Sequence, residues 1–149
     1  MSIGEFCNRE VIITDSGTGI EEAARLMREH HVGDLIVVES TEVGNVPIGI
    51  LTDRDLVIEV LAQGVDPSTV AVDDLMSRDP FVMAESADLF EALEQMRSKG
   101  VRRLPVVDAH GALVGVLTLD DLIEVVGEAI EDFVKIVKAE LRRETRLHR

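Results

Sequence analysis

The feature that most constrains the fold of this chain is an internal repeat. Residues 23–32 align with residues 92–101 at an offset of 69 positions, and both segments space their apolar residues as an amphipathic helix does. At the same offset, residues 35–38 align with residues 104–107, and each is a short apolar run typical of a buried strand. The chain is therefore expected to fold as two similar units.

The repeat continues through a motif of eight residues. Residues 49–56 align with residues 115–122 at an offset of 66 positions, so the turn before the motif is three residues longer in the first copy. A short extended segment precedes the first helix of each copy, at residues 11–13 and 81–83. A second helix follows each motif, at residues 56–62 and 122–126. Each unit is thus predicted to run strand, helix, strand, strand, helix.

The two units are expected at residues 7–64 and 70–127, joined by a linker that contains Gly64 and Pro67. Residues 73–76 are expected to lead into the second copy. A unit of about 60 residues with one small sheet buries too little apolar surface to be stable alone. We therefore predict a mixed α/β fold of the α+β type, in which a pseudo-twofold pair of β-α-β-β-α repeats packs sheet to sheet.

The C-terminal segment, residues 128–149, breaks the repeat and is expected to form a separate helix. Apolar residues follow one another on it at spacings of three or four, namely Ile130, Phe133, Val137 and Leu141. This stripe packs on the sheet pair of its own chain or offers an association surface. In either case we expect it to be covered.

Composition and charge exclude several classes of partner. The chain has 15 basic and 29 acidic side chains, a net charge of −14, and neither Trp nor Tyr, which disfavours a nucleic-acid partner. No apolar run is long enough to cross a bilayer and the N-terminus lacks the layout of a signal peptide, so we expect a cytoplasmic protein without membrane association. Cys7 is the only cysteine, which excludes an internal disulfide and a cysteine zinc cluster.

The repeated motif Gly-aliphatic-aliphatic-Thr-x-x-Asp ends a predicted strand and begins a helix, which places Thr52 and Thr118 at helix N-caps. One interpretation is structural, because Asp55 and Asp121 stand three residues later, as in a capping box. The other interpretation is functional. A helix N-terminus offers free N–H groups to a phosphate, and a nearby carboxylate accepts hydrogen bonds from ribose hydroxyls.

Two copies of this motif, each preceded by a short strand and an Ala-x-x-x-Met helix, resemble tandem cystathionine-β-synthase (CBS) domains, the Bateman module. The resemblance covers about residues 7–127. It implies a regulatory module, not an enzyme, that binds AMP, ADP, ATP or S-adenosylmethionine in clefts between the repeats and requires no other cofactor. It also implies a flat homodimer and a regulated protein partner. The alternative is a dimeric adaptor with vestigial clefts that acts through its C-terminal helix.

The resemblance assigns roles to residues of both motifs. It implies that Asp55 and Asp121 bind ribose and that the hydroxyls of Thr52 and Thr118 lie near phosphate. The arginines near the motifs are candidate phosphate contacts or ordinary surface residues, namely Arg54, Arg102 and Arg103.

Two departures from the family pattern predict that the clefts are unequal. Where many such repeats carry a Thr on the first strand, this chain has Ile13 and Val82, which leaves backbone groups to bind an adenine edge. The first repeat has Gly33-Asp34 where the second has Arg102-Arg103, so a carboxylate is expected to face a phosphate-binding region.

Other patterns indicate no further chemistry. His30 and His31 are adjacent and point to different faces of a helix, so no metal site is expected. Paired acidic residues such as Asp73 and Asp74 more often cap helices than catalyse reactions. No set of nucleophile, base and orienting group can be assembled, so no catalytic residue is assigned.

Overall fold

The computed structural model describes residues 1–148 and contains the two predicted units. The first consists of β1 (Ile13–Thr14), α1 (Ile20–His30), β2 (Asp34–Thr41), β3 (Gly44–Thr52) and α2 (Asp53–Leu56), which continues as a π-helical turn, η2 (Val57–Leu61). The second consists of β5 (Met83–Ala84), α4 (Leu89–Lys99), β6 (Arg103–Val107), β7 (Leu113–Thr118) and α5 (Leu119–Leu147). The short remaining elements are η1 (Ile3–Glu5), η3 (Pro67–Thr69), α3 (Val72–Leu75) and β4 (Ser77–Arg78). The predicted mixed α/β fold is confirmed.

Each unit has a small mixed sheet. The strand orders are β1-β2-β3-β4 and β5-β6-β7, with a parallel first pair and antiparallel hairpins after it. Both hairpins carry a register shift at the same point of the repeat, between Val37 and Val38 and between Val106 and Val107. The two copies therefore share this register shift as well as the order of their strands.

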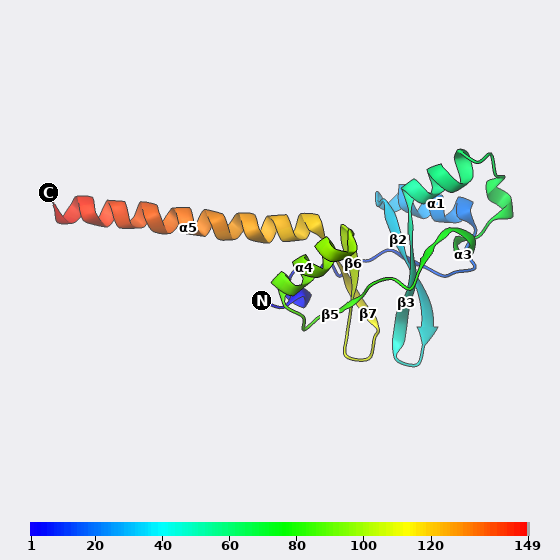
Figure 1. Cartoon of the computed structure of the whole chain (residues 1–149), viewed down its shortest axis with the longest axis horizontal. Coiled ribbons are helices and arrows are strands. Elements are labelled where there is room, and N and C mark those ends of the chain that lie inside the picture. The colour runs from blue at the N-terminus through cyan, green and yellow to red at the C-terminus, as the bar shows by residue number, and fades with distance from the viewer. Residues whose placement is uncertain (149) are drawn as a thin grey trace.

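The two sheets lie side by side at the end of the molecule from which α5 projects (Figure 1). Ile36 and Val38 of β2 form an apolar cluster with Val116 of β7, and partly buried residues such as Ile50 and Leu113 pack against it. Neither sheet could leave these side chains in water without losing the burial that stabilises the pair. The predicted packing of sheet against sheet is confirmed.

Each unit is completed by a chain segment that the repeat pattern does not include. Ile3 of η1 is fully buried in the core of the second unit, although it precedes the first. Val72 and Met76 lie in the core of the first unit, and β4 extends its sheet. Residues 73–76 thus lead into the second copy along the sequence, while Val72 and Met76 pack backward into the core of the first unit, which the repeat pattern did not indicate.

The first glycine of each motif allows these segments to cross the sheets closely. A Cβ atom on Gly49 would lie 2.6 Å from the Met76 sulfur, and one on Gly115 would lie 2.7 Å from the Cys7 sulfur. Burial raises the pKa of the Cys7 thiol, which keeps it neutral in this contact. Cys7 thus has a packing role against Gly115.

The C-terminal segment is not a separate helix. The helix that begins after the second motif, α5, runs without interruption for 29 residues, a length of about 43 Å, and Gly127 lies within it. Figure 1 shows α5 projecting away from both units. The stripe residues are exposed, from 55% for Val137 to 69% for Phe133, so they do not pack on the chain's own sheets. Arg149 lies outside the described residues.

Candidate ligand-binding cleft

Both motifs form capping boxes at the starts of their helices. The Thr118 hydroxyl accepts a hydrogen bond from the Asp121 N–H (3.2 Å), and Oδ2 of Asp121 accepts one from the Thr118 N–H (2.9 Å). Thr52 and Asp55 make the same two bonds with the same lengths. The structural interpretation of the motifs is thus confirmed. Because each box uses Oδ2, the second oxygen of each carboxylate is left for other donors.

A cleft of about 210 Å³ lies between the two units beside the second capping box. Its lining comes from the segment before β1, from the start of β2 and from β7: Asn8, Glu10, Val11, Ile12, Val32, Gly33, Asp34, Val116 and Thr118. A ligand in this cleft would contact both units at once.

One ion pair joins the units at the wall of this cleft. Arg103 donates a hydrogen bond from Nη1 to Oδ1 of Asp34, and both side chains are partly buried. The two residues occupy the same position in their repeats, so the pair lies where the pseudo-twofold arrangement brings equivalent positions together. With Glu10 also in the lining, the cleft carries two carboxylates, and the Arg103 guanidinium at its wall already has Asp34 as a partner.

A sequence model of the CBS domain matches this chain twice, over residues 3–62 and 72–128. The chain belongs to the CBS domain family. The two matches correspond to the two repeats, and each also includes the preceding segment that packs in the other unit; together they form a CBS pair.

Known relatives support this membership. An uncharacterized protein of Methanopyrus kandleri is 40% identical over 125 residues, which are 84% of this chain and 62% of that protein. Hypoxic response protein 1 of Mycobacterium tuberculosis is 38% identical over 134 residues, which are 89% of this chain and 91% of the relative.

Solved structures give the same architecture. The crystal structure of hypoxic response protein I with two coordinated zinc ions has a TM-score of 0.71 and 32% identity, covering 83% of this chain and 98% of that one. CBSX2 of Arabidopsis thaliana in complex with AMP has a TM-score of 0.71 and 27% identity, covering 86% of this chain and 97% of that one.

The CBS pair brings only part of the predicted site together. Thr118 and Asp34 line the cleft, and Arg103 forms its ion pair with Asp34 at the wall. Asp121 instead lines a neighbouring depression of about 230 Å³ with three further carboxylates, of Glu5, Glu124 and Glu128. The capping box separates these two hollows.

The remaining predicted residues lie elsewhere. Thr52, Arg54 and Asp55 are at the end of β3 and the start of α2, and the Arg54 side chain is exposed. The carbonyl of Arg102 accepts a hydrogen bond from the Leu119 N–H (2.8 Å), and its side chain is exposed. Ile13 pairs with β2 and is exposed, while the half-buried Val82 precedes β5. Their roles in ligand binding stay predictions.

Asn8 and Glu10 are the cleft residues that the repeat pattern missed. The backbone of Asn8 exchanges two hydrogen bonds with Val116 of β7, each 2.9 Å long. This contact joins residues far apart in sequence, so no local pattern marks it. The only signal in the sequence is the extended apolar segment just after it, at residues 11–13.

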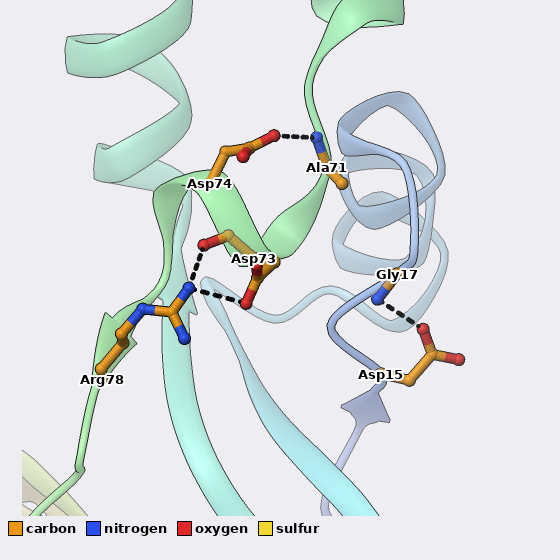
Figure 2. Close-up of polar contacts among 6 residues, drawn as sticks. All are labelled: Asp15, Gly17, Ala71, Asp73, Asp74 and Arg78. Carbon is orange, nitrogen blue, oxygen red and sulfur yellow. Dashed lines mark hydrogen bonds and ion pairs between the residues drawn. The ribbon is translucent and has the colours of Figure 1, made fainter.

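The acidic pair Asp73 and Asp74 serves the structure of the first CBS repeat. The Asp74 carboxylate accepts a hydrogen bond from the Ala71 N–H (2.9 Å), and Arg78 donates to both Oδ1 and the carbonyl of Asp73, as Figure 2 shows. In the same view the Asp15 carboxylate accepts a bond from the Gly17 N–H in the turn before α1. These carboxylates hold the chain at the ends of helices.

Residues 1–148 lack two further features. No group of three or more His, Cys, Asp or Glu side chains in this range is placed to hold a metal ion. No helix in the same range combines the length and the apolar character that crossing a membrane requires.

Proposed function

We propose that this CBS pair is a regulatory module that binds an adenosine-containing ligand in the cleft beside Thr118. The observation that carries the proposal is the cleft itself, which is lined by both repeats and ends at the N-cap of α5. The Thr118 hydroxyl lines this cleft and accepts its bond from the Asp121 N–H, so its own hydrogen is a donor for a ligand with hydroxyl or anionic groups. The AMP bound by CBSX2 supports this ligand class.

The charge of the cleft favours some adenosine ligands over others. Glu10 and Asp34 make the lining acidic, and a phosphate would compete with Asp34 for Arg103. S-adenosylmethionine carries a positive sulfonium and no phosphate, so its charged group would be attracted to these carboxylates. We therefore propose that the wild-type cleft binds S-adenosylmethionine more tightly than ATP.

Ligand binding would regulate by shifting the arrangement of the two repeats. A ligand that contacts Gly33 on one side and Thr118 on the other favours the arrangement in which both contacts are made. Because Thr118 is the N-cap of α5, a small rotation there moves the far end of a helix about 43 Å long. We propose that a cytoplasmic protein partner binds this chain and responds to the movement of α5.

Calorimetric titration of the full chain with AMP, ADP, ATP and S-adenosylmethionine tests the function. A saturable response to at least one ligand is expected, with S-adenosylmethionine ahead of ATP. The chain has neither Trp nor Tyr, so a strong band at 260 nm in freshly purified protein would report a copurified adenine ligand. No saturation with any of the four, and no such band, would contradict the proposal.

The second candidate is an adaptor or assembly protein that acts through its C-terminal helix. The exposed apolar residues of α5 favour it, because a lone helix with such a face has no partner within its own chain. The same titration separates the two functions, since an adaptor with vestigial clefts binds none of the four ligands. Both candidates are compatible with a homodimer.

A further inference from the structure

Helix α5 carries a continuous apolar seam that its own chain leaves uncovered. The seam consists of Ile123, Val126, Ile130, Val134, Val137 and Leu141, which are between 43% and 60% exposed. Ile130 and Leu141 are 11 residues apart, which is about three helical turns. This spacing of about 3.67 residues per turn is close to that of the helix itself, so the seam runs nearly straight along one face. The seam therefore matches another straight helix over its whole length.

The base of the seam opens into an apolar groove between α4 and α5. This groove has a volume of about 290 Å³, and its walls include Phe90, Leu93, Ile123 and Gly127. A Cβ atom on Gly127 would meet nothing within 4 Å, so the glycine leaves a notch on the helix surface. A glycine in a helix costs stability relative to alanine, and a close approach by a neighbouring helix is a physical reason to accept that cost.

The charges along α5 divide the helix into two halves of opposite sign. Between residues 119 and 132 the charged side chains of α5 are all acidic, and Glu124 and Glu128 are among them. Lys135 and Lys138 begin a half that is mainly basic and that continues to Arg142, Arg143 and Arg146. A parallel helix pair would set like charges against each other, whereas an antiparallel pair sets acidic against basic.

We propose that α5 pairs in antiparallel orientation with α5 of a second copy of this chain, seam against seam. A twofold axis between Val134 and Val137 places Ile130 against Leu141 of the second copy. The same axis brings Glu131, which flanks the seam, close to Lys138 on the same flank of the second copy, and the last turn of the second helix reaches the groove beside Phe90. The interface is isologous and closes on itself as a dimer.

Sedimentation equilibrium of the full chain tests the pairing. Wild type is expected to be a dimer, and Val134→Glu is expected to raise the dissociation constant at least tenfold. Ala139→Glu is the matched control, because it adds the same charge to the opposite face of the same helix and should change the constant less than threefold. A wild-type monomer, or a dimer that Val134→Glu leaves intact, would overturn the proposal.

Disulfide trapping tests the orientation. In a Cys7→Ser background, Ile130→Cys and Leu141→Cys proteins are mixed and oxidised. The antiparallel pair predicts that the disulfide between positions 130 and 141 forms in preference to both symmetric ones, because only those Cα atoms come within reach. A predominant 141–141 disulfide would show a parallel pair and overturn the proposal. Circular dichroism of each variant establishes that α5 is still helical.

Discussion

Asp34 and Arg103 show how the same position of two repeats acquires different chemistry. The alignment sets a carboxylate against a guanidinium, and the pseudo-twofold arrangement brings the two side chains into contact. The ion pair connects the repeats, and it also occupies the arginine that would otherwise be free for a ligand phosphate. One residue difference between the copies is thus enough to give the cleft an acidic character.

Asp34→Asn is expected to change which ligand the cleft prefers. The variant frees Arg103 and removes one carboxylate from the lining, so ATP and AMP should bind about tenfold more tightly, as a charge-assisted hydrogen bond replaces a repulsion. The affinity for S-adenosylmethionine should fall. Stability should drop by no more than about 1 kcal/mol, because the pair is partly exposed. Calorimetric titration measures the affinities.

Asp120→Asn is the control for this exchange, because Asp120 is an exposed carboxylate of the same motif and does not line the cleft. It should leave the ligand preference unchanged. If both variants alter the preference equally, the effect comes from net charge and not from release of Arg103.

The two threonine caps allow the structural and the functional role of the motif to be separated. Thr118→Ala and Thr52→Ala remove the same hydrogen bond from equivalent boxes, so each should cost about 1 kcal/mol of unfolding free energy. Only Thr118 lines the cleft, so only Thr118→Ala should weaken ligand binding there, by about tenfold. Urea unfolding and titration give the two quantities. Equal losses of affinity would mean that the caps act through stability alone.

At the scale of elements, the crossing segments decide how the two units hold together. The segment that contains Cys7 and Asn8 passes over β7 at Gly115, and the segment that contains Met76 passes over β3 at Gly49. Each segment belongs by sequence to the neighbouring repeat. The two units are therefore interleaved, and neither core is complete without the other part of the chain.

Gly115→Ala is expected to destabilise the protein by about 1–3 kcal/mol, because the new methyl would lie 2.7 Å from the Cys7 sulfur and 2.8 Å from the Asn8 carbonyl oxygen. The backbone at Asn8 cannot yield as a flexible side chain does. Gly19→Ala is the control, since its Cβ would meet nothing within 4 Å. Thermal unfolding compares them. A loss for Gly115→Ala no larger than for Gly19→Ala would show that the crossing segment shifts at little cost.

The elements that the sequence predicted are those that depend on local spacing. The strand and helix order followed from apolar periodicity, and the capping boxes followed from the three-residue spacing of Thr118 and Asp121. Gly127 was misleading, because an isolated glycine weakens a helix without ending it. The crossing of Ile3 and Met76 into the opposite units depends on contacts between distant residues, which no local pattern records.

Charge is distributed unevenly over the whole molecule. The two repeats, which form the acidic body, carry most of the negative charge, and the C-terminal part of α5 is nearly neutral. Residues 1–127 contain 24 of the 29 acidic side chains, whereas residues 128–149 contain six basic and five acidic ones. Two acidic bodies repel each other at close range, and the antiparallel α5 pair keeps them at opposite ends of a long helix pair. The charge distribution and the proposed dimer therefore favour the same extended arrangement.

This arrangement predicts the outcome of a charge exchange along α5. Reversing one basic residue with Lys138→Glu should raise the dimer dissociation constant about fivefold, because an acidic residue would then face Glu131 of the second copy at both symmetric places. Adding Glu131→Lys to the same chain should restore most of the affinity, and sedimentation at about 50 mM salt measures both steps. Raising the salt to about 0.5 M should reduce the difference, because screening shortens the reach of exposed charges. If the double variant dimerises no better than Lys138→Glu alone, the acidic and basic halves do not meet, and the antiparallel register is wrong.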